Sequence, residues 1–123
     1  MIGLETMLGR TFVYIDNRDD EQIIFVDTDG SEYIFHHEQD CCETVRVIDI
    51  VGDLNDLMNC PLLIAEESTS DKRPEDQDQS YYRDDSETWT FYRFATIKGT
   101  VVIRWCGSSN GYYSESVQLD INL

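Results

Sequence analysis

A short segment of this chain, residues 36–43, concentrates side chains that can hold a metal ion. Two histidines, two cysteines and three acidic residues fall within its eight positions, which read His36-His37-Glu38-Gln39-Asp40-Cys41-Cys42-Glu43. Thiolates and neutral imidazoles suit zinc, which takes four ligands in a tetrahedron at about 2.0 to 2.3 Å. The sequence therefore predicts a structural zinc ion with His37, Cys41 and Cys42 as three of its ligands.

The fourth ligand of such a site has to come from another position. Cys60 is the first candidate, and the alternatives are Cys106, Asp40, Glu43 or a residue of a second copy of the chain. Neighbouring side chains in a strand point to opposite faces, so we expect only one of the two adjacent histidines to face the metal.

A disulfide is the first alternative for the adjacent cysteines. Neighbouring Cα atoms lie about 3.8 Å apart across a trans peptide, whereas disulfides usually span about 4.4 to 6.8 Å. We therefore expect a bridge between Cys41 and Cys42 to be strained and easily reduced, and pairing with Cys60 or Cys106 stays open. The chain begins without the features of an export signal, which predicts a reducing cytoplasm. A second alternative is that both cysteines are small apolar core residues.

Charge is the next informative property. The chain has 25 acidic and 9 basic residues, a net charge of −16 with neutral histidine. Residues 1–67 hold 16 of the acids and three of the bases, a net charge of −13. Such a surface repels nucleic acid and anionic membranes and attracts basic proteins, including those that bind nucleic acid. Solubility alone is the simpler explanation of the same charge.

The pattern of apolar residues predicts a single domain over residues 1–123 with an α+β fold, made mostly of antiparallel β meander sheets with one or two short helices. No apolar run approaches the roughly 20 residues that cross a bilayer. The short helices are expected at 2–8 and 52–58, the second one capped by Asp53. The predicted strands are 11–15, 22–26, 32–35, 44–50, 62–65, 88–97, 101–105 and a last strand near 117–119, the final three forming a meander.

Two further expectations concern the second half of the chain. Residues 66–86 are polar and nearly free of aliphatic side chains, which predicts a mobile acidic loop that serves as a contact surface or is a dispensable insertion. The aromatic and aliphatic residues around this loop are expected to form the core. The core residues named by this pattern are Trp89, Phe91, Ala95, Ile97, Ile103 and Trp105.

Several stretches together resemble a family of small proteins from bacteriophages and prophages. They are His37-Glu38-Gln39-Asp40-Cys41-Cys42-Glu43, Gly52-Asp53-Leu54, Ala65-Glu66-Glu67, Thr88-Trp89-Thr90-Phe91-Tyr92 and Ser109-Asn110-Gly111-Tyr112-Tyr113-Ser114.

The chain is also similar in its general character to type II-A anti-CRISPR inhibitors, some of which look like metal-binding proteins. This resemblance implies a phage-encoded inhibitor in the cytoplasm of a bacterial host. The implied partner is a type II CRISPR nuclease, whose basic channel for target DNA the inhibitor blocks. An inhibitor of another host defence protein or of a restriction enzyme is the alternative within the same class.

A catalytic role for the segment is the competing hypothesis. A small cysteine-dependent hydrolase would use one thiol as nucleophile and one histidine as base, and a zinc-dependent hydrolase would need an open coordination position for water. Three acidic residues surround the thiols, and nearby negative charge opposes formation of a thiolate. The sequence also has no glycine-rich or basic cradle for a phosphate. We therefore expect a binding protein, not an enzyme.

Overall fold

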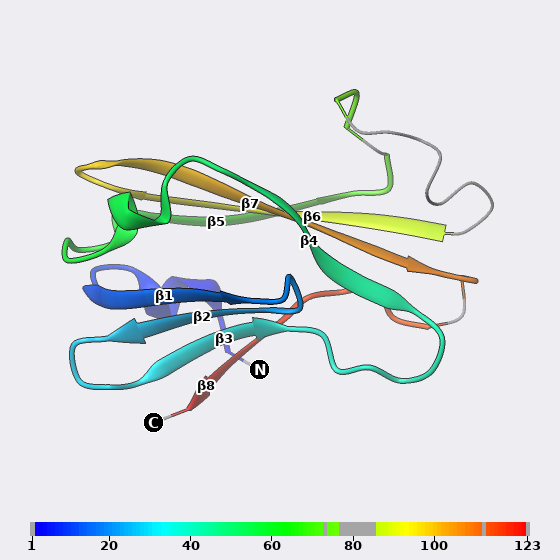
Figure 1. The fold of residues 1–123 in the computed structure, drawn as a ribbon, viewed down its shortest axis with the longest axis horizontal. Helices are drawn as coiled ribbons and strands as arrows, with labels where there is room; N and C mark the ends of the chain where they lie inside the picture. The colour runs from blue at the N-terminus through cyan, green and yellow to red at the C-terminus, as the bar shows by residue number, and fades with distance from the viewer. Residues whose placement is uncertain (1, 73, 77–85, 112, 123) are drawn as a thin grey trace.

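The computed structural model describes residues 2–72, 74–76, 86–111 and 113–122 (Figure 1). Within them the chain forms eight β-strands and two 3-10 turns. In chain order these elements are η1 (Leu4–Met7), β1 (Phe12–Arg18), β2 (Gln22–Asp27), β3 (Glu32–His36), β4 (Thr44–Val51), η2 (Leu54–Leu57), β5 (Ile64–Ser70), β6 (Ser86–Thr96), β7 (Gly99–Ser109) and β8 (Gln118–Asn122).

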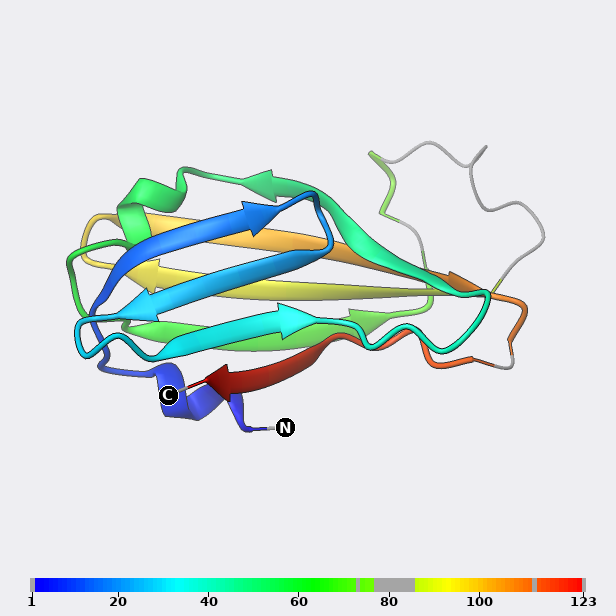
Figure 2. The same cartoon turned by 60° about the horizontal axis from the view of Figure 1, so that its bottom comes forward.

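The strands form two antiparallel four-stranded sheets, ordered β1-β2-β3-β8 and β4-β7-β6-β5. Figure 1 shows the sheets as two layers that face each other, and Figure 2 shows the first sheet from its outer side. This β-rich architecture with only two short helical turns confirms the predicted fold class. No helix among the described residues has the length and apolar character needed to span a membrane.

Aromatic rings fill the space between the two sheets. Phe25 of β2 lies 5.1 Å from Phe94 of β6, and Phe35 of β3 lies 4.8 Å from Tyr92, measured between ring centroids. In β3 the buried residues Tyr33 and Phe35 alternate with half-buried neighbours, which is the period of two expected when one face of a strand packs on the core. The burial of these rings holds the layers together.

Most local elements lie where the sequence predicts them, except that β5 runs from Ile64 into the predicted loop, but the order of strands in the sheets differs from the prediction. The first three strands pair as predicted, and the Asp53 side chain accepts a hydrogen bond from the Asn55 amide at 2.9 Å, as expected of a cap. The predicted meander of the last three strands is wrong, because β8 pairs with β3 in the other sheet and not with β7. The connection from β7 to β8 therefore links one layer to the other.

Four of the six predicted core residues are buried, and two of them, Ile103 and Trp105, belong to the core cluster between the sheets. Trp89, Ala95, Ile103 and Trp105 are buried. Phe91 is half-buried, and Ile97 is 83% exposed because it lies in the turn between β6 and β7.

The loop expected at residues 66–86 is shorter than predicted. Glu66 to Ser70 belong to β5 and pair residue by residue with β6, which begins at Ser86. Of the connection that remains, residues 73 and 77–85 lie outside the described part of the chain. Asp76 in the described part accepts hydrogen bonds from the Arg104 guanidinium at 3.0 and 3.1 Å, and Arg104 also binds Asp49. This ion pair ties the connection to β7, on the side of the sheet away from the core.

The crossing segment that leads into β8 approaches β7 closely at Gly107. A Cβ atom at Gly107 would lie 2.3 Å from the backbone oxygen of Glu115, so only glycine fits there. The buried Glu115 carboxylate accepts hydrogen bonds from the hydroxyls of Thr88 at 2.8 Å and of Ser109. These contacts attach the crossing segment to both β6 and β7.

Replacing Gly107 with alanine should destabilise the fold by about 1 to 3 kcal/mol, because backbone must move to admit the methyl group. Urea denaturation measures the loss as a lower midpoint. Thr100→Ala, at an exposed position of the same strand, is the control and should change the free energy of unfolding by less than about 0.5 kcal/mol. Equal effects of the two substitutions would contradict the close approach at Gly107.

Candidate functional site

The segment that carries the sequence motif connects the two layers of the sandwich. It leaves β3 in the first sheet and enters β4 in the second, at the end of the molecule where the β7 to β8 connection also crosses (Figures 1 and 2). Residues 37–43 are called the crossing loop below. A loop that passes over the end of a core has few regular hydrogen bonds of its own, so its polar groups need other partners.

The carboxylate of Glu43 supplies most of these partners. Its side chain is fully buried, and it accepts hydrogen bonds from the backbone amides of Asp40 and Cys41, both at 2.9 Å. It also contacts Nε2 of His37 at 2.8 Å and accepts a longer bond from the Gln39 amide at 3.3 Å. The loop is thus folded around one buried negative group.

These hydrogen bonds change the acidity of Glu43. The contact with His37 and the two backbone N–H donors lower the pKa of Glu43 from 4.5 to about 2, against the opposing effect of burial. The other ring nitrogen of His37, Nδ1, lies 2.8 Å from the backbone oxygen of Ser116. His37 therefore joins the crossing loop to the connection between β7 and β8, and both of its ring nitrogens have hydrogen-bond partners.

His36 has a different partner from His37. Its Nε2 lies 2.6 Å from a carboxylate oxygen of Asp120 in the neighbouring strand β8, and this contact lowers the pKa of Asp120. The two adjacent imidazoles therefore belong to separate interactions, as alternation along a strand predicts.

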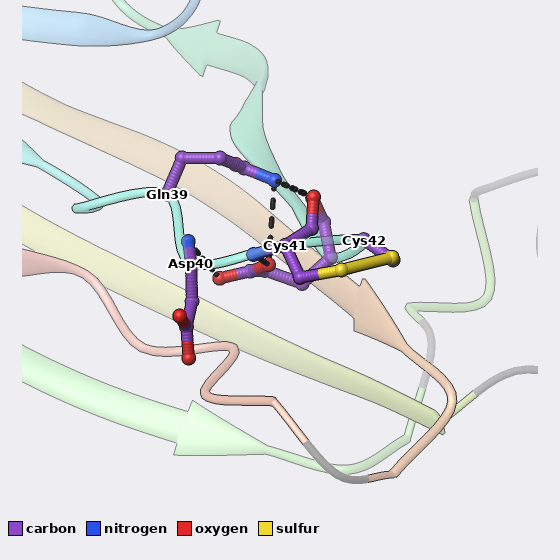
Figure 3. Close-up of a disulfide and its surroundings, with 5 residues drawn as sticks. Gln39, Asp40, Cys41 and Cys42 are labelled. Atoms are coloured by element: carbon purple, nitrogen blue, oxygen red, sulfur yellow. Dashed lines mark hydrogen bonds between the residues drawn. A yellow bond between two sulfur atoms is a disulfide. The ribbon is translucent and has the colours of Figure 1, made fainter.

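The structure places the two cysteines differently from the expectation of two separate thiols. Cys41 and Cys42 are both exposed and are joined by a disulfide, which Figure 3 shows beside Gln39 and Asp40. Cys60 follows η2, which lies at the opposite end of the sandwich from the crossing loop (Figure 1). Cys106 is buried within β7. Cys60 is therefore too distant to be the fourth zinc ligand.

In this arrangement the predicted ligands do not fit a zinc ion. Both nitrogens of His37 have hydrogen-bond partners, and the sulfurs of Cys41 and Cys42 are bonded to each other. Among the described residues, no three or more His, Cys, Asp or Glu side chains are grouped as metal ligands. Zinc binding stays a prediction, and it requires a reduced pair of cysteines and a His37 released from Glu43.

A cleft of about 740 Å³ opens beside the crossing loop. Its walls are the turn between β1 and β2, the end of β3 with the crossing loop, and the start of β4. The lining residues are Arg18, Asp19, Glu21, Gln22, His36, His37, Gln39, Glu43, Thr44, Val45 and Arg46.

The turn that forms one wall has an uncommon backbone. Asp19 and Asp20 have φ angles of 55° and 61°, and the Glu21 amide donates to the Arg18 carbonyl at 3.0 Å, as in a type I′ turn. The Asp20 carbonyl accepts a hydrogen bond from the Val47 amide of β4 at 2.7 Å, which joins the two sheets. Sequence reasoning placed a turn here but missed its part in the cleft, because nothing local signals a bond to a strand far along the chain.

Both arginines that line the cleft have acidic partners outside its lining. Arg18 pairs with Asp16 at 3.0 Å, and Arg46 pairs with Asp20 at 3.6 Å. Neither adjacent cysteine lines the cleft, and His37 is bonded to Glu43. The geometry thus offers neither a cationic phosphate site nor a thiol next to a free histidine base, and it gives the hydrolase hypotheses no support.

Replacing Glu43 with glutamine should loosen the crossing loop. The change removes the negative charge that two backbone amides and His37 bind, so the amides of Asp40 and Cys41 should exchange with solvent about tenfold faster or more. Hydrogen exchange read by NMR measures this directly. Glu38→Gln, at an exposed position of the same loop, should leave both exchange rates unchanged, and faster exchange in that control would contradict the role given to Glu43.

Acid should remove the contribution of Glu43 to stability within a defined interval. Because its pKa is lower in the folded chain, ionised Glu43 stabilises the fold above about pH 4.5, and the contribution is lost as pH falls toward about 2. Glutamine does not titrate, so the stability difference between the wild type and Glu43→Gln should narrow over this interval. Urea denaturation at a series of pH values measures it, and a difference that stays constant from pH 5 to 2 would show that Glu43 does not titrate as described.

Comparison with known proteins identifies a family. Residues 5–119 match the model of a family described as a domain of unknown function, DUF7448. No curated protein matches the chain. No solved structure matches it either. Since the match spans nearly the whole chain, both sheets and the crossing loop included, this protein belongs to the DUF7448 family.

Proposed function

We propose that this protein is a binding module, without catalytic activity, that docks its acidic end onto a basic surface of a nucleic-acid-binding protein. The observation that carries the proposal is the display of acidic side chains around the crossing loop. Buried Glu43 fixes the loop backbone, while Glu38 and Asp40 in the same loop are exposed. Exposed Asp19 and Glu21 lie on the turn across the cleft.

A fixed acidic surface is suited to compete with nucleic acid. Proteins that bind DNA or RNA present arginine and lysine to phosphate groups, and a carboxylate surface of matching shape can take the same sites. Holding the loop before binding avoids the entropy that a flexible loop loses on docking. The net charge of −16 adds long-range attraction for a basic partner and repulsion of nucleic acid itself.

The resemblance to anti-CRISPR inhibitors implies the class of the partner. RNA-guided DNA nucleases hold nucleic acid in a positively charged channel, and the proposed action is to occupy that channel so that target DNA does not load. An inhibitor of another host defence protein or of a restriction enzyme would need the same acidic surface, and the identity of the captured protein separates these possibilities. The proposed mechanism requires no metal ion.

Charge reversal at the crossing loop should test the proposal. Glu38→Lys with Asp40→Lys should weaken binding to a type II nuclease with its guide RNA by about tenfold or more at low salt, and restore DNA loading. Binding of the wild type should also weaken as salt increases. Calorimetry and a DNA-loading assay measure both effects.

The matched control reverses the same number of charges elsewhere. Glu5→Lys with Glu75→Lys changes two exposed acidic residues that are not part of the crossing loop and should alter the affinity far less. Equal weakening by the two double variants would show that net charge, and not this surface, governs binding. Unimpaired DNA loading with the wild type would exclude this nuclease as the partner.

A further inference from the structure

The Cys41–Cys42 disulfide takes no part in holding the crossing loop. Every hydrogen bond that fixes the loop around Glu43 uses backbone groups or the side chains of His37 and Gln39. The backbone amide of Cys41 is one of these donors, but its sulfur is not. The loop should therefore keep its shape whether the sulfurs are bonded or not.

A disulfide between adjacent residues also does little to stabilise a fold. Disulfides act mainly by restricting the unfolded chain, and the effect grows with the number of residues in the closed loop. Here the sequence separation is one, which is the smallest possible. A structural role therefore explains neither the presence nor the position of this bond.

The position of the pair suits chemistry with an external thiol. Both cysteines are exposed, whereas Cys106 is buried and Cys60 lies between Asn59 and Pro61, which pair with the start of β1 at the other end of the sandwich. An exchange partner must therefore come from outside the chain. In a reducing compartment, such as the sequence predicts, the disulfides that occur are mostly transient or redox-sensing.

We infer that Cys41 and Cys42 form a reversible thiol–disulfide exchange site whose substrates are external dithiols. A thiolate of the dithiol attacks one sulfur of the pair, a mixed disulfide forms, and the other cysteine leaves as a thiolate that takes up a proton. The second thiol of the reagent then attacks the mixed disulfide and releases the first cysteine. Two electrons and two protons pass from the dithiol, which becomes a cyclic disulfide, to the protein, which gains two thiols.

The acidic residues of the loop select among such reagents. Glu38 and Asp40 are exposed and lie within four residues of both cysteines in the chain, and their charges repel an anionic thiol while leaving neutral or cationic thiols unhindered. The exchange site therefore prefers uncharged or positively charged reductants. This selection acts on the protein alone and does not depend on the function proposed above.

Mass spectrometry of the full chain, purified without reductant, tests the exchange. After reduction with dithiothreitol and alkylation of the free thiols, both cysteines should carry the alkyl label on the proteolytic peptide of residues 19–46. Oxidised dithiothreitol, added to reduced protein before alkylation, should restore the disulfide. The Cys60→Ser variant should react identically. The amides of residues 40 and 41 should stay protected after reduction and in the Cys41→Ser, Cys42→Ser double variant.

Charge selection needs a second measurement. At low salt, 2-aminoethanethiol should open the disulfide about tenfold faster than mercaptoacetate when each rate is corrected for its thiolate fraction. Glu38→Gln with Asp40→Asn should reduce this ratio, and the Glu5→Gln control should not.

Three results would overturn the inference. The first is that alkylation labels both cysteines in protein that was never reduced, and that oxidised dithiothreitol does not form the disulfide in a second sample that was not alkylated. The second is loss of amide protection at residues 40 and 41 on reduction, which would make the bond structural. The third, a rate ratio that is unchanged by removing the two acids, would reject the charge selection.

Discussion

The buried carboxylate of Glu43 is the group on which the structure of the crossing loop depends. A charge removed from water is costly unless protein donors replace the lost hydration. Here two backbone amides, His37 and Gln39 provide that replacement. These donors lie on a stretch that would otherwise be an irregular connection between two sheets, so satisfying one side chain fixes the path of the whole loop. The same contacts depress the pKa of Glu43, which keeps the group ionised through the neutral range.

A second buried carboxylate organises the other connection at the same end. Glu115 binds the hydroxyls of Thr88 and Ser109, and the contact of His37 with the Ser116 carbonyl links the two connections. Loops of a sandwich usually tolerate change because they lie outside the core. These two are anchored inside it, each by an acidic side chain that points away from solvent. The exposed acidic residues beside these connections are consequently carried on a fixed backbone. The proposed competition with nucleic acid requires such a fixed surface.

Sequence reasoning reached the local structure and missed the long-range contacts, for reasons that particular residues illustrate. Alternation of apolar residues located the strands, and Asp53 was recognised as a cap because its partner is only two residues away. The pairing of β8 with β3 depends on the connection from β7 crossing to the other sheet, which no local pattern encodes. In the motif, His37 and Glu43 are residue types that often bind metal ions, but in the structure they contact each other as an ion pair. Ligand-type side chains look alike in a sequence whether they bind an ion or each other.

The hydrogen bond between the Asp20 carbonyl and the Val47 amide involves main-chain atoms only. Its formation is therefore indifferent to which side chains occupy positions 18, 21 and 46, which line the neighbouring cleft. Mutation can change the charge or polarity of these three side chains while the hydrogen bond between the sheets persists. Evolution can therefore vary the chemistry of this cleft wall without rebuilding the contact between the sheets.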